Sequence, residues 1–309
     1  MKIYDCFTFF NELELLELRL KILSPYVDYF ILVESNITFR GKTKPFYFDI
    51  NDNRFKSYKN KIIHIKYENI PQETKPNDYS LEIQQRNYIF QGLQQINNCN
   101  DNDLVIISDL DEIPNPNILK HLKENTLFAK NNLLKLHRIF RKRKNKFTAY
   151  SKYIQLLLKY NQNASILNIL NITPLSFSQK HYYYYINYLH PDKWFGSVIS
   201  LYKNMKAPQE LRNLRRRLPI LDNGGWHFAY MGGINRILNK VNSTVDENNS
   251  RNINKVYTET HIKKCLNNGS LIYDYQNKEH NVFTKIPLNN LDIPNIDIFI
   301  NKYPNFYLK

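Results

Sequence analysis

The sequence has few cysteines and lacks any long apolar run. Cys6, Cys99 and Cys265 are odd in number and widely spaced, so we expect neither a disulfide framework nor a zinc site built on paired cysteines. The N-terminus enters a strand-like segment directly, without the charged region, apolar region and cleavage site of a signal peptide. The apolar runs are too interrupted to span a membrane. These absences predict a cytoplasmic protein whose only membrane contact would be peripheral.

Acidic residues are also scarce, because 28 Asp and Glu stand against 43 Lys and Arg and give a net charge of +15. The excess favours polyanionic partners or serves solubility. No nucleic-acid-binding motif accompanies the charge, so nucleic acid is not expected as a partner. Six basic side chains fall within residues 138–146, where they form either a solvated face or a peripheral contact with an anionic membrane. A hydrophobic content of 42% is ample for a packed core.

Strand and helix patterns alternate over the first hundred residues and predict an α/β fold with a mostly parallel sheet. We expect strands at residues 2–9, 29–34, 61–67 and 104–108. Helices are expected at residues 13–22, where Ser24 and Pro25 end the pattern, and at residues 81–96. Residues 133–175 resemble a helical insertion that projects from this core.

The most informative stretch is the apolar strand at residues 104–107, which runs into Asp109, Asp111 and Glu112 before Pro114 ends the ladder. Alternation would place Asp109 and Asp111 on one face, at the edge of the sheet where open α/β folds bind ligands. A divalent cation, Mn²⁺ or Mg²⁺, fits between such a carboxylate and a substrate phosphate. We predict Asp111 as the direct ligand, Asp109 as a contact to ribose, to a metal-bound water or to a helix end, and Glu112 as a brace for the turn.

Further candidates lie on the neighbouring elements. Glu34 ends the second strand and either accepts hydrogen bonds from a ribose or is a surface acid. Arg86 and Asn87 lie on the helix before the acidic strand, where they contact a diphosphate or sugar, or form a helix-surface ion pair. Asn11 either lines the nucleotide pocket or caps the leucine-rich helix.

A second motif reads Asp-Asn-Gly-Gly-Trp-His-Phe at residues 222–228. Paired glycines allow close backbone approach, Trp226 offers an apolar platform for a sugar, and His227 is either a ligand for metal or phosphate or a structural residue. Trp194 is a second platform or a core residue. An arginine cluster just upstream either neutralises a diphosphate or an acidic acceptor, or is exposed to solvent; it comprises Arg212, Arg215, Arg216 and Arg217.

Several ordered motifs together resemble glycosyltransferase family 17, the family of β-1,4-mannosyl-glycoprotein β-1,4-N-acetylglucosaminyltransferases. They lie at residues 3–13, 27–34, 38–42, 85–87, 108–114 and 224–228. The resemblance implies one GT-A-like (Rossmann-like) domain over residues 1–309, a nucleotide-sugar donor and a divalent metal, commonly manganese, with inversion at the anomeric carbon. Residues 1–132 would form the nucleotide-sugar-binding half, including Arg40 in its third motif, and residues 176–309 the acceptor side.

Inversion in one displacement needs a carboxylate base that takes the proton of the acceptor hydroxyl. Glu247 matches an acid in the family's histidine-x-acid pattern, and Asp222 is the nearest acid before the tryptophan motif. The chain departs from the family at Val245, where a histidine is expected, and at Asn235, where an acid is expected. The resemblance implies transfer of N-acetylglucosamine from UDP-GlcNAc to a glycan, glycolipid or glycoprotein. A catalytically impaired sugar- or nucleotide-binding relative and a metal-dependent phosphotransferase or nuclease are the alternatives.

Overall fold

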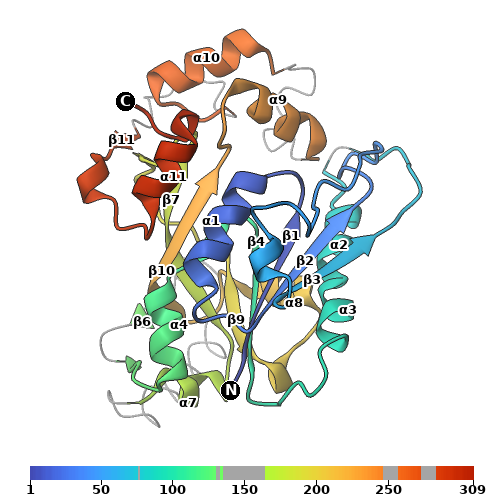
Figure 1. Ribbon diagram of the computed structural model, residues 1–309, viewed down its shortest axis with the longest axis vertical. Coiled ribbons are helices and arrows are strands. Elements are labelled where there is room, and N and C mark those ends of the chain that lie inside the picture. Colours follow the sequence, from blue (N-terminus) through green and yellow to red (C-terminus); the bar gives the residue numbers. More distant parts are fainter. Residues whose placement is uncertain (76, 130–132, 135–163, 246–256, 273–282) are drawn as a thin grey trace, which may run out of the picture.

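The computed structural model describes residues 1–75, 77–129, 133–134, 164–245, 257–272 and 283–309 (Figure 1). Within these residues the strands form a single mixed sheet, most of which follows the order β11-β8-β7-β9-β4-β1-β2-β3, while β10 pairs with β5, β6 and β7. The strands are β1 (Ile3–Phe9), β2 (Tyr29–Ser35), β3 (Ile62–Tyr67), β4 (Leu104–Asp109), β5 (Glu112–Pro114), β6 (Leu133–Leu134), β7 (Leu175–Tyr183), β8 (Tyr188–Leu189), β9 (Val198–Leu201), β10 (Ile220–Ala229) and β11 (Thr284–Lys285).

The first four strands of the sequence, β1 to β4, pair in parallel and lie in the order β4-β1-β2-β3. Every residue of β1 is buried, as expected for a central strand that is covered on both faces. The chain leaves β1 toward β2 on one side and later enters β4 on the other, so the strand order reverses between β1 and β4. Ligands of open α/β sheets bind at the carboxyl ends of such a pair of strands.

Helices cover both faces of this parallel region (Figure 1). Alternate residues of β1 and β4 pack against α1, α4 and α11 on one face, and the residues between them pack against α3 on the other. α9 and α10 form a third cluster at one end of the molecule. The helices are α1 (Leu13–Leu23), α2 (Ser80–Asn87), α3 (Ile89–Gln94), α4 (Pro116–Lys123), α7 (Ile166–Leu170), α8 (Pro208–Leu214), α9 (Ile234–Ser243), α10 (Glu259–Asn268) and α11 (Ile296–Lys302), with 3₁₀ turns at Lys56–Tyr58, Tyr202–Asn204, Leu288–Asn290 and Pro304–Phe306.

Strand β10 brings the second sequence motif, residues 222–228, beside β5, which follows Asp109 and Asp111 in the chain. It runs antiparallel to β5, with Trp226 opposite Ile113 and His227 opposite Glu112. Gly225 permits this pairing, because its φ is +119° and a Cβ there would lie 2.1 Å from the carbonyl oxygen of Ile113. The motif at residues 222–228 is therefore fixed beside the turn that carries Asp111.

The structure confirms the predicted α/β class, with a central mixed sheet and flanking helices in a Rossmann-like arrangement. The helix predicted at residues 81–96 is instead two helices that meet at Tyr88, whose ring lies 4.2 Å from that of Tyr67. Most of the predicted insertion, including the basic residues 138–146, lies outside the described residues, as does Glu247. Among the described helices, none has the length and apolar character that crossing a bilayer requires.

Candidate active site

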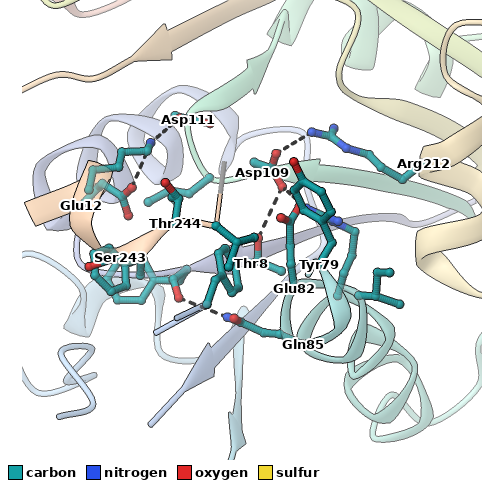
Figure 2. Close-up of a pocket in the computed structure, with 18 of the residues that line it drawn as sticks. Thr8, Glu12, Tyr79, Glu82, Gln85, Asp109, Asp111, Arg212, Ser243 and Thr244 are labelled. Atoms are coloured by element: carbon teal, nitrogen blue, oxygen red, sulfur yellow. Dashed lines mark hydrogen bonds and ion pairs between the residues drawn. The ribbon is translucent and has the colours of Figure 1, made fainter. Parts of the chain in front are cut away.

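A cavity of about 620 Å³ opens at the carboxyl ends of β1 and β4 (Figure 2). Its walls come from the ends of these strands, from residues 37–39 after β2, from α2 and α8, and from β10 and α9. Its volume lies within the usual range for small-molecule sites. Arg86, Asp109, Asp111 and His227, all predicted as site residues, line this cavity.

Arg19 on α1 lies in the protein interior and holds residues 109–112 in place. These residues join β4 to β5 and are called the acidic turn. The guanidinium of Arg19 is fully buried and pairs with Asp5 at 2.6 Å. Its Nη1 donates hydrogen bonds to the carbonyl oxygens of Asp109, Leu110 and Glu112 at 3.0, 2.9 and 2.9 Å. Three backbone acceptors between β4 and β5 thus share one buried cation, which fixes the path of the turn.

Asp109 is held by two arginines. Arg86 on α2 lies 2.7 Å from its Oδ1, Arg212 on α8 lies 2.5 Å from its Oδ2, and the hydroxyl of Thr8 lies 3.4 Å from Oδ1. Burial opposes ionisation, but the charges of Arg212 and Arg86 outweigh it and hold the pKa of Asp109 well below its usual range. The Asp109 carboxylate is therefore ionised and already paired on both oxygens.

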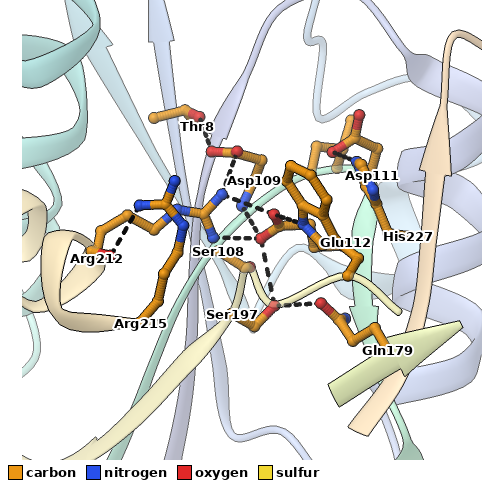
Figure 3. Close-up of polar contacts among 12 residues, drawn as sticks. Thr8, Ser108, Asp109, Asp111, Glu112, Gln179, Ser197, Arg212, Arg215 and His227 are labelled. Atoms are coloured by element: carbon orange, nitrogen blue, oxygen red, sulfur yellow. Dashed lines mark hydrogen bonds and ion pairs between the residues drawn. The ribbon is translucent and has the colours of Figure 1, made fainter. Parts of the chain in front are cut away.

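Glu112 anchors the other side of Arg212 (Figure 3). Its carboxylate is fully buried and forms an ion pair with the Arg212 guanidinium. It also accepts hydrogen bonds from Trp194 Nε1 at 2.6 Å and from the backbone N–H of Asp109 at 3.0 Å. The contact to the Asp109 backbone agrees with the bracing role predicted for Glu112. The same contacts fix Arg212 and the indole of Trp194 at the cavity wall.

Asp111 has different partners. Lys240 on α9 lies 2.9 Å from its Oδ2, and Nε2 of His227 lies 3.6 Å from its Oδ1. Burial again opposes ionisation, yet Lys240 and His227 hold the pKa of Asp111 well below its usual range. The backbone N–H of Phe228 donates to the carbonyl of Asp111 at 2.8 Å, which places His227 beside the carboxylate.

His227 lies within a stack of rings. Its imidazole stacks on Trp194 at 4.4 Å and on His181 at 4.7 Å between centroids. His227 Nδ1 and His181 Nε2 are buried and have no hydrogen-bond partner within the described residues. Burial, and next the neighbouring His227, lower the pKa of His181 to about 2, so this imidazole is neutral at physiological pH.

The donor set at Asp111 fits a divalent cation in part. Ligand atoms about 2.0–2.2 Å from a metal can lie up to about 4.2 Å apart, and the 3.6 Å between Asp111 Oδ1 and His227 Nε2 is within that limit. No group of three His, Cys, Asp or Glu side chains that could hold a metal occurs in the described part of the chain. Asp111 and His227 would thus supply two ligands to such a cation, and further positions would fall to water or substrate oxygens.

The charges on the cavity wall are unbalanced. Six cationic side chains and four carboxylates line it, an excess of two positive charges among the described residues. The cations come from Lys44, Arg86, Arg212, Arg215, Arg216 and Lys240, and the carboxylates from Glu12, Glu82, Asp109 and Asp111. Such a cavity suits a doubly negative ligand.

Other predicted residues lie off the cavity wall. Trp226 is 2% exposed, packs in the core and donates from Nε1 to Asp292, whereas Trp194 lines the cavity. Glu34 is fully buried and contacts His64 Nε2 at 3.1 Å, with Lys44 nearby. The predicted residues absent from the wall are Asn11, Glu34, Arg40, Asn87, Asp222 and Trp226, and their binding or catalytic roles stay predictions.

Two of these residues connect elements around the cavity instead. Arg40 donates from Nε to the carbonyl of Thr244 at 2.7 Å and so joins the segment after β2 to the end of α9. Asn87 accepts a hydrogen bond from the backbone N–H of Gln209 at 3.1 Å, which joins α2 to α8. Asn11 precedes the N-cap position of α1, which Glu12 occupies without a side-chain cap.

Sequence reasoning missed Lys240, Arg19 and Thr8. Thr8 carries a usable signal, because it lies at the end of β1 and pairs in register with Asp109 on β4. Lys240 and Arg19 have none, since they lie 129 and 90 residues from the side chain or carbonyl that each contacts. Only the packing of α9 and α1 against the acidic turn reveals them.

Comparison with known proteins gives one family and a set of relatives. Residues 1–143 match Glycosyltransferase family 17. Over 107 residues the chain is 28% identical to the Homo sapiens and Rattus norvegicus proteins named beta-1,4-mannosyl-glycoprotein 4-beta-N-acetylglucosaminyltransferase, and 27% identical to that of Mus musculus. Each match covers 34% of this chain and 20% of the relative, so the chain spans about a fifth of these relatives' length. The predicted resemblance is confirmed for the segment that carries Arg86, Asp109 and Asp111.

Proposed function

We propose that this chain, which resembles glycosyltransferase family 17 over its first 143 residues, is an inverting, metal-dependent glycosyltransferase with a GT-A-like site. It transfers N-acetylglucosamine from UDP-GlcNAc to a glycan, glycolipid or glycoprotein. The observation that carries the proposal is the placement of Asp111, with His227 and Lys240, in a 620 Å³ cavity at the point where the strand order reverses. Such a crevice is where α/β sheets bind nucleotides.

The nucleoside would lie against the ends of β1 and β2. Phe10, Thr38 and Phe39 line the cavity there and offer aromatic surface and one hydroxyl for a base and ribose. From this position the diphosphate would extend toward Asp111, because Lys240 and His227 contact that carboxylate and also line the cavity. The doubly negative donor then offsets part of the positive charge of the cavity and of its bound cation.

Charge accumulates on the diphosphate as the sugar leaves, and the site is arranged to neutralise it. A divalent cation held by Asp111 and His227 would act there as a Lewis acid. Lys240 is the second source of positive charge, because its ammonium lies 2.9 Å from Asp111 and 3.4 Å from Glu12 and can transfer these contacts to phosphate oxygens. Stacking between Trp194 and His181 fixes the ring plane of His227.

Glu247 is the proposed base. It comes two residues after Val245, which lines the cavity, whereas Asp222 lies off the wall. The base must remove the acceptor proton on the face of the sugar opposite the diphosphate. Glu247→Gln should therefore leave UDP affinity unchanged and remove transfer.

The test is calorimetric titration of the wild-type protein with a panel of nucleotides, with and without Mn²⁺, followed by a donor and acceptor screen read by mass spectrometry. We expect Mn²⁺-dependent binding of UDP and UDP-GlcNAc and a mass increase of one N-acetylhexosamine on an acceptor. Binding of UDP-GlcNAc without transfer to any acceptor would instead indicate a catalytically impaired relative. Equal binding of all nucleotides, or of none, would contradict the proposal.

A further inference from the structure

Arg215 differs from the two arginines beside it. Arg86 and Arg212 both contact carboxylates, and the charge of Asp109, which outweighs burial, raises the pKa of each guanidinium. Arg215 also lines the cavity, but its only hydrogen bond to a described residue goes from Nη1 to the carbonyl of Arg212 at 3.0 Å. Among the described residues, no hydrogen-bond partner reaches its buried Nε, and no carboxylate forms an ion pair with its guanidinium. Within the described part of the chain, Arg215 is thus a cation at the cavity wall without an ion-pair partner, although Glu112 and Asp109 act on it from a greater distance.

The surroundings make this placement unfavourable unless a ligand completes it. Burial, and next the charge of Arg212, lower the pKa of Arg215. Arg216 follows on the same wall and adds a further positive charge. A partly buried guanidinium normally finds a carboxylate or phosphate, with which it forms paired, charge-assisted hydrogen bonds.

We propose that Arg215 and Arg216 form an anion subsite that binds a phosphate or carboxylate group of the acceptor. This rests on the proposed function, in which the diphosphate of the donor lies at Asp111, Lys240 and His227. In Figure 3, Arg212 and Arg215 lie on one side of Asp109. Asp111 and His227 lie together on the other side. The two clusters therefore provide separate positions for two anionic groups.

Charge balance supports a second anion. Among the described residues the wall carries an excess of two positive charges; the proposed base Glu247 would remove one of these, and a bound divalent cation would add two. A nucleoside diphosphate sugar brings two negative charges, so a positive excess persists in the loaded site. An acceptor with a phosphate or carboxylate close to its reacting hydroxyl would neutralise that excess at Arg215.

The donor diphosphate is the other source of such a group, and competition separates the two. We would saturate the protein with UDP and Mn²⁺ and then titrate inorganic sulfate, a tetrahedral dianion that stands for a phosphate ester. The wild type should still bind sulfate. Arg215→Gln should weaken sulfate binding about 10-fold, the effect of losing charge-assisted hydrogen bonds, and leave UDP affinity unchanged. Arg215→Lys should recover part of the loss.

Arg217→Gln is the matched control, because Arg217 is exposed, lies in the same cluster and does not line the cavity. It should bind sulfate as the wild type does. Thermal melting should show no loss of stability in Arg215→Gln, since the removed cation has no carboxylate partner. That readout separates a binding role from a structural one.

Two outcomes would overturn the proposal. If sulfate does not bind once UDP and Mn²⁺ are present, or if Arg215→Gln weakens UDP as strongly as sulfate, the subsite belongs to the donor. Failure of the wild type to bind UDP with Mn²⁺ is a separate result that contradicts the proposed function. In that case, Arg215-dependent sulfate binding to the protein alone would still support an anion subsite.

Discussion

Asp109 and Asp111 are two residues apart, yet they are held in different ways. Asp109 lies between two guanidiniums, and one of these is itself fixed by the fully buried Glu112. Asp111 contacts the ammonium of Lys240 and the imidazole of His227. Lys240 also pairs with Glu12, but that carboxylate is partly exposed, so no buried carboxylate fixes Lys240 as Glu112 fixes Arg212. Planar, paired contacts of arginine are geometrically specific, whereas an ammonium is a point charge on a flexible stem.

The difference separates structure from chemistry within one motif. The Asp109 side ties β4 to α2 and α8, so its charges are occupied by the protein itself. On the other side, we expect Asp111 to exchange Lys240 for a metal cation, and Lys240 to exchange Asp111 for a phosphate, without loss of the fold. Of the two carboxylates, Asp111 is therefore the one suited to act on a substrate.

The largest expected effect comes from Glu112→Gln. Loss of this buried charge weakens the ion pair with Arg212 and should lower the free energy of unfolding by about 3–5 kcal/mol, measured by urea denaturation. Glu124→Gln is the control, because Glu124 is exposed on the end of α4. A change below about 1 kcal/mol would mean that the Asp109 side is not the structural one.

Asp111→Asn should have the opposite profile. We expect at least about 100-fold weaker Mn²⁺-dependent UDP binding by calorimetry, because loss of even an indirect metal contact costs about 10–100-fold. The melting temperature should fall less than in Glu112→Gln, since Lys240 keeps its contact with Glu12 and the Asp111 side chain is less buried than that of Glu112. Retained Mn²⁺-dependent affinity would move the metal site elsewhere and remove the distinction between the two carboxylates.

The stack behind Asp111 predicts a pH dependence. The pKa of His181 is lowered to about 2, against about 6.5 in the unfolded chain, so the unfolded state binds the extra proton between these values. The stability that the neutral His181 contributes is fully present above about pH 6.5 and is lost progressively as the pH falls below that value. His181→Phe should remove about 2 kcal/mol of the stability difference between pH 7 and pH 5 in urea denaturation. The exposed His121→Phe should leave the difference unchanged, and an unaltered slope in His181→Phe would contradict a neutral buried imidazole.

The smallest effect concerns Lys240→Met. Removal of the ammonium that competes for Asp111 should tighten Mn²⁺ binding by about 5-fold in an electron paramagnetic resonance titration without nucleotide. UDP should bind more weakly, because the same ammonium is proposed to meet the diphosphate. Arg236→Met is the control on the same helix, since Arg236 pairs with Glu14 away from the cavity wall. Weaker Mn²⁺ binding in Lys240→Met would exclude competition at Asp111.

Local patterns predicted the parallel strands well. Apolar runs at residues 29–34 and 104–108 became β2 and β4 almost to the residue, because strands buried on both faces must be apolar throughout. The break at Tyr88 had no signal, since neither glycine nor proline marks it. It coincides with a close ring contact to Tyr67, which belongs to the tertiary structure.

The site was predictable where its residues share one motif. Asp109 and Asp111 follow one strand, and Arg86 lies on the helix before it. β4 ends at Asp109, so the alternation that would place both carboxylates on one face does not extend to Asp111. Alternation does hold on β10, where it explains why Trp226 enters the core while His227 faces the cavity. Lys240 required the packing of α9, which local pattern does not encode.

Arg19 has a further consequence for how the protein adapts to substrates. Three carbonyl groups of the acidic turn share its guanidinium, so movement of the turn would expose a buried cation and break several hydrogen bonds together. The turn is therefore the stationary part of the cavity. Adjustment to a donor or an acceptor falls to the side chains on the opposite walls, Lys240 on α9 and Arg215 at the end of α8, which can change partners while the backbone beneath Asp109 and Asp111 stays still.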